Sequence, residues 1–384
     1  MSALRELRRR LAPAVVDMAR RGETALANET MFEDVAYYRD SARFEAERIK
    51  LFRETPVVAC LSHDLPGPGS YRTFDDTGVR ILLTRGKDGA VRAFLNVCPH
   101  RAARVVPVGC GKANRFTCRF HAWTFDSAGR NIGLPEEHWF GEEVAAQKHL
   151  IPCPTEERHG LVFVLATPGG TMNLDAHLGA FGAELDILDL GNAEQVHGED
   201  IPVHANWKYG MDTFFETYHL NALHRETFKG FFSPVCVFET FGRHHRFTFA
   251  PLTLDEWTRT PEAEWDIDLL PLQYFIFPNT IMAVGSTSKE GAVINIHRIF
   301  PESADFFVSR MAYCAAGGIT SEAQRAEIDK AYEVARKAIV EDDYAVTGEG
   351  HAGLCQLPEG TKLPIGRQEI GVQTFHRNVR EATA

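Results

Sequence analysis

Cys98-Pro-His100-Arg101 and Cys118-Arg-Phe-His121 are two short motifs in the first third of the chain, and each of them pairs one thiol with one imidazole. Thiolates and imidazoles are good ligands for soft and borderline metal ions, and the two motifs together supply four ligands. A β-like run over residues 91–97 leads directly into the first motif. The sequence therefore predicts a metal centre that is held by two loops of a small antiparallel sheet.

Two kinds of centre use two cysteines and two histidines. In a Rieske 2Fe-2S cluster, two cysteines hold one iron and two histidines hold the other. A structural zinc site is the alternative, but its short motifs usually pair Cys with Cys and His with His. Because both motifs mix the two residue types in the same order, we expect the cluster, with four cofactor-binding residues: Cys98, His100, Cys118 and His121.

The length and composition fit a two-domain enzyme, because a chain of 384 residues can bury two cores. The net charge of -11, without a basic block, argues against nucleic acid or an anionic membrane as the partner, and no apolar run is long enough to span a membrane. The amino terminus lacks the apolar segment of a secretory signal. The cysteines outside the two motifs have no repeated spacing, so we expect reduced thiols and a cytoplasmic protein.

A second informative stretch runs from Asn206 to His224. On a helix, Glu216 and His219 would share a face, whereas His224 would point about 140° away from His219. Both imidazoles can therefore face one ion only if His224 lies past a kink or at a helix end. By themselves, the two histidines are better explained as one core residue and one surface residue.

The two stretches together resemble the Rieske non-haem iron oxygenases, the family of aromatic ring-hydroxylating dioxygenase alpha subunits. In that family Asn-Trp-Lys, here residues 206–208, precedes an acidic residue, a Tyr-His pair and a second histidine five residues further on. The likeness extends over nearly the whole chain, from residues 37–52 to residues 366–377. It implies that His219 and His224 are ligands of a mononuclear Fe(II), which commonly takes two histidines and one carboxylate.

The carboxylate must come from elsewhere in the chain. A helical pattern from Ser321 to about Tyr344 opens with a capping-box signal, and its phase places Asp342 and Asp343 on either side of an apolar stripe. The phase does not choose between the two. Family members commonly show an acidic pair whose second member binds iron, ten residues before a Gly-Leu pair that is found here at 353–354. The resemblance therefore implies Asp343 as the metal ligand, with Asp342 as the alternative.

The resemblance gives roles to two further acidic residues. Glu216, three residues before the first iron ligand, is expected to be a catalytic residue that links a cluster histidine of one protomer to an iron histidine of its neighbour. Many family members have Asp at this position, so the longer Glu leaves the substrate class open. Asp212 occupies another catalytic position, where the family has a polar or acidic neighbour of the iron.

The order of predicted elements indicates an α+β fold. β-like runs recur between residues 235 and 315, and the long helix follows them. We expect an N-terminal helical arm over 1–45 that packs on the catalytic domain, a small antiparallel β Rieske domain over 46–165, and a catalytic mononuclear iron domain over 166–384. The resemblance implies a helix-grip fold for the catalytic domain, in which an antiparallel sheet wraps around helices.

The resemblance implies a terminal oxygenase that uses O2 to hydroxylate an aromatic or other apolar small molecule. Nine phenylalanines between Phe214 and Phe249, among them Phe231, suit such a substrate, although core packing explains most of them equally well. Oxidative N- or O-demethylation, or hydroxylation of a quaternary ammonium compound, is the alternative. A protein of another class, a Rieske electron carrier without a working mononuclear iron, would also contain the two Cys-His motifs.

The one GxGxxG run, at residues 348–353, follows a helical pattern instead of a β-like run, so it is not a nucleotide fingerprint, and the chain contains no all-cysteine ferredoxin motif. NAD(P)H and flavin are therefore expected on a separate reductase, which donates electrons directly or through a ferredoxin. The cofactors that the resemblance implies for the chain itself are one Rieske 2Fe-2S cluster and one mononuclear Fe(II). The resemblance also implies a homotrimer with head-to-tail contacts.

Overall fold

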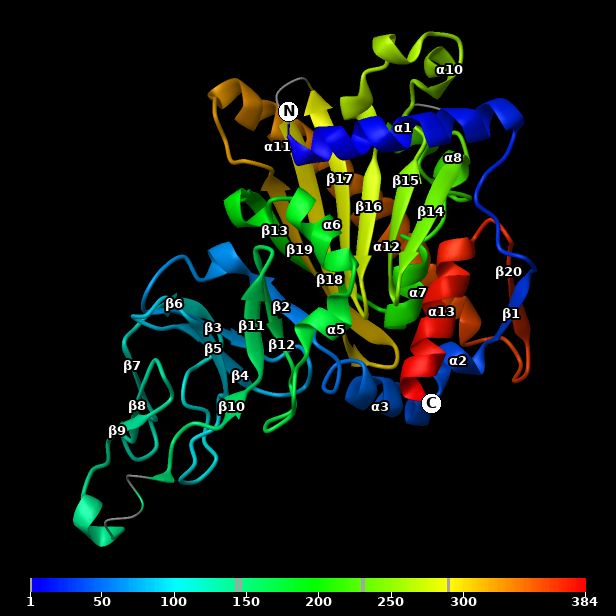
Figure 1. Cartoon of the computed structure of the whole chain (residues 1–384). Helices are drawn as coiled ribbons and strands as arrows, with labels where there is room; N and C mark the ends of the chain where they lie inside the picture. Colours follow the sequence, from blue (N-terminus) through cyan, green and yellow to red (C-terminus); the bar gives the residue numbers. More distant parts are fainter. Residues whose placement is uncertain (1, 142–143, 145–146, 229–231, 289–290) are drawn as a thin grey trace. The chain divides into compact units, whose positions relative to one another are not determined.

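The structure is a computed structural model that describes residues 2–141, 144, 147–228, 232–288 and 291–384. The chain folds into two compact units (Figure 1). The small unit is Arg48–His177, and the large unit combines Met1–Glu47 with Leu178–Ala384. The N-terminal segment is therefore part of the same unit as the C-terminal half, and the small unit continues beyond the expected limit at 165.

The small unit is built from short antiparallel strands, as expected. They form three sheets in the orders β10-β5-β4-β3-β6, β11-β12-β2 and β7-β8-β9. One core of apolar side chains includes Phe94, Trp123 and Phe125 and also the two cysteines of the sequence motifs. The strands are β2 Val57–Leu61, β3 Ser70–Phe74, β4 Ile81–Arg85, β5 Val91–Leu95, β6 Cys110–Lys112, β7 Arg115–Thr117, β8 Thr124–Asp126, β9 Asn131–Gly133, β10 Pro152–Cys153, β11 Thr155–Arg158 and β12 Leu161–Val164.

The large unit contains a seven-stranded antiparallel sheet in the order β13-β19-β18-β17-β16-β15-β14. The β-like runs predicted between residues 235 and 315 all lie in this sheet. A separate two-stranded sheet pairs β1 (Met31–Asp34) with β20 (Lys362–Ile365). The seven strands are β13 Glu194–Val203, β14 Cys236–Phe241, β15 His244–Phe249, β16 Leu272–Ile276, β17 Thr280–Ser288, β18 Gly291–Ser303 and β19 Phe306–Ala315.

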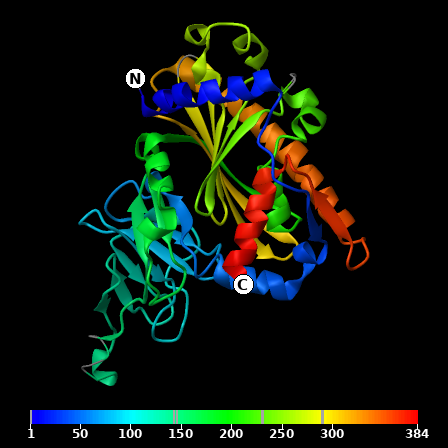
Figure 2. The ribbon, with the colours of Figure 1, turned by 45° about the vertical axis from the view of Figure 1, so that its right-hand side comes forward.

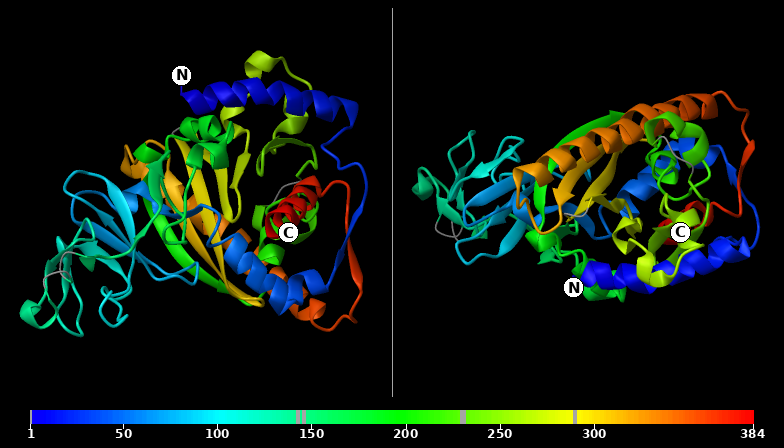
Figure 3. Two further views of the ribbon diagram at one scale, coloured as in Figure 1. Left: turned by 60° about the horizontal axis from the view of Figure 1, so that its bottom comes forward. Right: turned by 90° about the horizontal axis from the view of Figure 1, so that it is seen from above.

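Helices cover both faces of the seven-stranded sheet (Figures 2 and 3). On one face, Phe181 of α6 (Phe181–Ile187) stacks on His244 of β15, and α1 (Ala3–Arg21) lies over the same side. On the opposite face, Tyr332 of α11 (Glu322–Arg336) stacks on His197 of β13. The expected α+β fold, with helices held against an antiparallel sheet, is confirmed.

The remaining helices are short, apart from α3, α12 and α13. Within the described residues, no helix combines the length and the apolar character that crossing a bilayer requires. These helices are α2 Ala36–Arg39, α3 Ser41–Lys50, α5 Leu174–Leu178, α7 Trp207–Asp212, α8 Leu220–Leu223, α9 Arg225–Phe228, α10 Leu254–Trp257, α12 Tyr344–Leu354 and α13 Ile370–Thr383.

The helix predicted from Ser321 onward begins as the sequence indicates, because the Ser321 side chain accepts a hydrogen bond from the N–H of Gln324. Beyond α11, however, residues Lys337–Asp343 form a π-helical segment. A π turn holds more residues than an α turn, so it shifts the helical phase. Accordingly, the buried residue of this segment before the acidic pair is Ala338, and the regular phase assumed from the sequence was wrong beyond Arg336.

Candidate metal centres

Two loops of the small unit carry the four ligands expected for the cluster. Cys98 follows β5, and Cys118 follows β7 directly. The two loops share the same backbone hydrogen bonds. The N–H of Cys98 donates to the carbonyl of Ala103, and the N–H of Ala102 donates to the carbonyl of Cys98. In the second loop, Cys118 pairs in the same way with Trp123 and Ala122. Ala102 and Ala122 have left-handed φ angles of 56° and 58°. Two loops of matching backbone geometry therefore each present one cysteine.

The donor groups of the two loops suit a cluster. The side chains of Cys98 and Cys118 are 3% and 1% exposed, and both thiols are free. The ring centroids of His100 and His121 lie 4.5 Å apart, and His100 stacks on Trp123. Nδ1 of His100 is buried without a hydrogen-bond partner among the described residues. A buried nitrogen normally has a partner, so an unpartnered one beside two free thiols fits a metal ligand.

The geometry favours a cluster over one zinc ion. A zinc ion would need its four ligand atoms gathered around one point. In the described part of the chain, no three of these four groups have ligand atoms within 4.8 Å of one another, whereas one set of three groups in the large unit does. The four donors of the small unit are spread more widely, as two irons require.

The set in the large unit is His219, His224 and Asp343. Oδ1 of Asp343 lies 3.1 Å from Nε2 of His224 and 3.6 Å from Nε2 of His219. His224 and Asp343 are 2% and 5% exposed, so the ligand atoms are shielded from solvent. Two imidazoles and one carboxylate that converge on one point are the ligand set of non-haem Fe(II) oxygenases.

The short helix α8 positions both histidines. The Asn206 side chain begins α7 by accepting a hydrogen bond from the N–H of Lys208, but α7 ends at Asp212. After a non-helical connection, His219 is the N-cap residue of α8 and His224 is its C-cap residue. The structure thus places His224 at a helix end, which is the position that the spacing requires.

Glu216 contacts His219, but not through the shared helix face that the sequence predicted. The two residues do not share a helix face, because the chain between α7 and α8 is not helical. Instead, the Glu216 carboxylate accepts hydrogen bonds from the N–H groups of Tyr218 and His219, which folds it back onto α8. Its other oxygen contacts Nδ1 of His219.

The second imidazole also has a carboxylate on its outer nitrogen. Oδ2 of Asp342 lies 3.1 Å from Nδ1 of His224. A carboxylate accepts hydrogen bonds, so Asp342 suits a proton on Nδ1 of His224, and Nε2 is the nitrogen that faces Asp343. Asp342, the alternative ligand from the sequence, therefore faces the back of His224, whereas Asp343 faces the point where the ligand atoms converge.

The two adjacent aspartates occupy different electrostatic surroundings. Burial raises the pKa of Asp343, against the opposing effect of His224. Burial also disfavours the charge of Asp342, but hydrogen bonds from Thr227 and His224 outweigh it and lower the pKa of Asp342. For His224, burial would lower the pKa, yet the two carboxylates outweigh burial and raise it.

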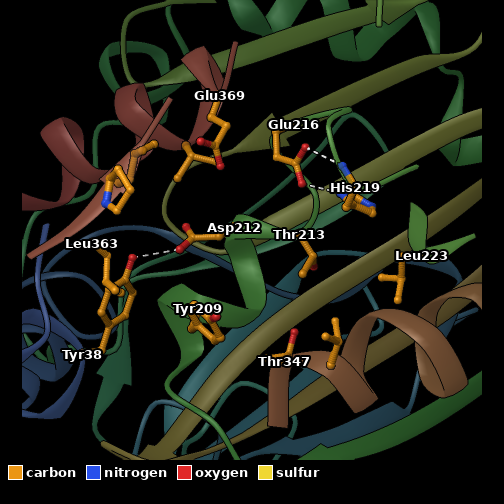
Figure 4. A pocket seen from close by; sticks show the side chains of 14 residues that line it. Tyr38, Tyr209, Asp212, Thr213, Glu216, His219, Leu223, Thr347, Leu363 and Glu369 are labelled. Carbon is orange, nitrogen blue, oxygen red and sulfur yellow. Dashed lines mark hydrogen bonds and ion pairs between the residues drawn. The ribbon is translucent and has the colours of Figure 1, made fainter. Parts of the chain in front are cut away.

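A cavity of about 360 Å³ lies beside His219 (Figure 4). Three carboxylates line it: Asp212, Glu216 and Glu369. Burial, and then the negative charges of Glu216 and Asp212, raise the pKa of Glu369. Leu223, Val346 and Val372 contribute apolar wall. The cavity therefore combines concentrated negative charge with an apolar lining.

Asp212 lies in a network that the sequence did not reveal. Its Oδ2 accepts a hydrogen bond of 3.0 Å from the hydroxyl of Tyr38, and its Oδ1 lies 3.0 Å from Nε2 of His376 (the Tyr38 contact is drawn in Figure 4). Nδ1 of His376 contacts the hydroxyl of Tyr37 at 3.2 Å. These partners come from α2 and α13, at opposite ends of the chain, so no local pattern could connect them with Asp212.

Comparison with family models assigns the class. The model of the ring hydroxylating alpha subunit (catalytic domain) matches residues 190–384, and the model of the Rieske [2Fe-2S] domain matches residues 55–146. The chain therefore belongs to the family of Rieske oxygenase alpha subunits, which carry a Rieske cluster and a mononuclear iron.

Individual relatives resemble it over about half of their length. The carnitine monooxygenase oxygenase subunit of Acinetobacter baumannii is 34% identical over 199 residues, which are 49% of this chain and 51% of that protein. The 2-aminobenzenesulfonate 2,3-dioxygenase subunit alpha of an Alcaligenes species is 31% identical over 194 residues, 50% of this chain and 49% of that protein. The chain thus spans about half the length of the curated relatives it matches.

Solved structures with a similar fold cover nearly the whole chain. The quaternary ammonium Rieske monooxygenase CntA in complex with L-carnitine has a TM-score of 0.78 and 22% identity, over 92% of this chain and 96% of that chain. Naphthalene 1,2-dioxygenase with indole has a TM-score of 0.75 and 18% identity, over 94% of both chains. These likenesses show a shared fold.

Proposed function

We propose that this chain is the terminal oxygenase component of a Rieske oxygenase system, which uses O2 and externally supplied electrons to oxidise a small organic molecule. The observation that carries the proposal is the convergence of His219, His224 and Asp343 in a chain that also contains a Rieske domain. A Rieske electron carrier would need no second metal site. The buried two-histidine, one-carboxylate set therefore favours the oxygenase.

In this proposal the cluster ligands are Cys98, His100, Cys118 and His121, and the iron ligands are His219, His224 and Asp343. When bound, the cluster supplies single electrons and the ferrous ion binds and activates oxygen. The chain's own contribution is positional. Helix α8 fixes one imidazole at each of its ends, and a carboxylate contacts each Nδ1 atom, which orients both Nε2 atoms toward the position of the ion.

We propose a separate NAD(P)H-dependent flavin reductase as the electron donor, acting directly or through a ferredoxin. The one GxGxxG run of the sequence, at residues 348–353, lies inside helix α12 and does not follow a strand, so it does not match a dinucleotide-binding site, which supports this division of labour. None of the eight cysteines, all of which the structure describes, forms a disulfide, which fits a reducing compartment and supports a cytoplasmic protein.

Charge supports head-to-tail contacts between copies of the chain. The segment from Cys98 to His121 contains five cations and no acidic residue. Arg104 pairs with Asp75, but the other four cations have no ion-pair partner within the described part of the chain: Arg101, Lys112, Arg115 and Arg119. The cavity beside His219 carries the opposite charge. We therefore propose a homotrimer in which each cluster loop faces the acidic cavity of the next copy.

Within this trimer, Glu216 would connect a cluster histidine of one copy to His219 of the next. Its carboxylate already contacts Nδ1 of His219 and lines the cavity. Replacement of Arg101 and Arg119 by Glu should dissociate the trimer in sedimentation velocity experiments, whereas the same replacement of Arg9 and Arg21 on α1 should not. A wild-type protein that sediments as a monomer would contradict the assembly.

For the substrate we propose a small quaternary ammonium compound. Several relatives are named for carnitine or glycine betaine, which supports this class. The ring of Phe228 lies 5.1 Å from that of His224, and the ring of Phe232 lies 5.3 Å from that of Phe228, so aromatic side chains, which can attract a cation, lie next to an iron ligand. Phe231 lies outside the described residues. This choice reverses the order expected from the sequence.

An aromatic substrate is the second candidate, because one relative is named for 2-aminobenzenesulfonate. Oxygen uptake by the purified chain with a Rieske-system reductase should separate the two, using carnitine, glycine betaine and γ-butyrobetaine against simple arenes and aminobenzenesulfonates. Anaerobic metal analysis should give three irons per chain. Two irons per chain and no substrate-dependent uptake would contradict the oxygenase and favour the electron carrier.

A further inference from the structure

The imidazole of His224 lies between two consecutive carboxylates. Oδ1 of Asp343 lies 3.1 Å from its Nε2, and Oδ2 of Asp342 lies 3.1 Å from its Nδ1. The ring is 2% exposed, so water has little access to either contact. Because the ring has only these two polar atoms, both are occupied, and its orientation is fixed by the two aspartates.

Asp342 is itself held by a second side chain. The hydroxyl of Thr227 donates a hydrogen bond of 2.7 Å to the same Oδ2 that contacts His224. Thr227 belongs to α9, three residues after His224. The two donors meet on one carboxylate oxygen, which restricts where that oxygen can sit.

The π-helical segment makes this arrangement accessible. On a helix, consecutive side chains diverge by about 100°, so two neighbours rarely serve one small ring. Here Asp342 and Asp343 are the last two residues of the π segment, and they contact opposite nitrogens of the same imidazole. A π turn is often found at functional sites, where it re-aims side chains.

We propose that Asp342 is a positioning residue of the iron site, not an iron ligand: it contacts Nδ1 of His224 and so aims Nε2 at the metal, with Thr227 as its support. This inference rests on the proposed function. It assigns to Asp342 and Thr227 a role in metal affinity that neither residue would have if the acidic pair were a solvated helix end.

The test measures iron retention and a spectroscopic signal of the iron. Wild-type and variant proteins are compared by the rate at which a chelator removes the mononuclear iron under anaerobic conditions. Asp342→Ala should bind iron about 10- to 100-fold more weakly, as is usual when the partner of a ligating histidine is lost. Asp342→Asn and Thr227→Val should show smaller losses. Glu341→Gln is the matched control, because Glu341 precedes Asp342 and is exposed.

A spectroscopic readout separates positioning from general stability. The spin-resonance signal of the nitric oxide adduct of Fe(II) should change in Asp342→Asn, while the visible spectrum of the cluster stays as in the wild type. Glu341→Gln should change neither. Thr227→Val keeps the test decisive even where an Asp342 variant fails to fold.

Two results would overturn the inference. One is wild-type iron retention and an unchanged spin-resonance signal in Asp342→Ala. The other is complete loss of the iron in Asp342→Ala together with full retention in Asp343→Ala, which would make Asp342 the ligand. His224→Ala tests the proposed function separately: if it keeps the third iron, the oxygenase site itself is wrong, whatever the Asp342 variants do.

Discussion

The side chains of Glu47 and Lys208 form an ion pair that is almost completely withdrawn from solvent. The ammonium nitrogen lies 2.7 Å and 2.8 Å from the two carboxylate oxygens, and the side chains are 0% and 1% exposed. The indole N–H of Trp207 donates to the same carboxylate at 3.0 Å. This pair joins α3 to α7, the helix that ends at Asp212.

Removal of one partner of this pair should destabilise the large unit. Lys208→Met would leave the Glu47 carboxylate buried without its counter-charge, and such a change costs about 3–5 kcal/mol. The double variant Glu47→Leu with Lys208→Met should recover most of that loss, because it leaves no buried charge. The free energy of unfolding in urea checks both expectations. Equal destabilisation by the single and the double variant would show that the charges do not matter here.

The two metal centres should be separable by mutation. Asp343→Ala and His219→Ala should each lower the iron content from three to two per chain and leave the visible spectrum of the cluster unchanged. Cys118→Ser should abolish the visible spectrum of the cluster and leave the mononuclear iron bound, because it removes a thiolate from the cluster and changes no ligand of the mononuclear iron. Metal analysis with visible spectra distinguishes these outcomes. Loss of both centres in any one variant would indicate a shared folding defect instead.

Glu216→Gln should slow electron delivery while the iron stays bound. The Glu216 carboxylate accepts hydrogen bonds from two backbone N–H groups and contacts Nδ1 of His219. In Gln one of the two carboxylate oxygens is replaced by an NH2 group, which would then face one of these donors without being able to accept its hydrogen bond. We expect product formation to fall about 10- to 100-fold. Single-turnover oxidation of the reduced cluster measures this step. Glu226→Gln, at an exposed position of α9, is the control and should behave like the wild type.

His245 should make the protein sensitive to mild acid. Burial, with a smaller effect of His244, lowers the pKa of His245 to about 3. In the unfolded chain the ring takes up a proton near its ordinary pKa of 6.5, so stability is lost as the pH falls from 6.5 toward 3. For this one group the loss is roughly 1.4 kcal/mol per pH unit.

His245→Phe should remove this contribution. The His245 ring packs against Phe215 and Phe275 at centroid distances of 4.7 Å, and neither of its nitrogens has a hydrogen-bond partner among the described residues. Urea unfolding between pH 5 and pH 8 should show a growing advantage of the variant as the pH falls. Parallel curves for the two proteins would contradict the burial argument, and the exposed His138 provides a neutral control, as His138→Gln.

The sequence predicted those parts of the site that depend on short spacings. Two cysteines and two histidines in one pair of short motifs indicate a metal centre without any further context. The runs between 235 and 315 are rich in β-branched and aromatic residues, which is typical of strands. His219 and His224 could be paired because only four residues lie between them, although their role became clear only through the resemblance to a family.

The remaining parts depend on contacts between distant segments. Tyr38 and His376 meet Asp212 from opposite ends of the chain, and no local pattern in the sequence connects them. The division of labour between Asp342 and Asp343 was hidden for another reason. It depends on a π-helical segment, and sequence periodicity read with a regular helix does not reveal where such a segment begins.

Asp343 and the pair of histidines that flank α8 belong to segments that are far apart in the chain. An ion bound between them would act as a cross-link, closing a long loop without a covalent bond. Loss of the ion would remove this cross-link, so proteases should cut the chain near α8 faster in the iron-free protein than in the iron-loaded one.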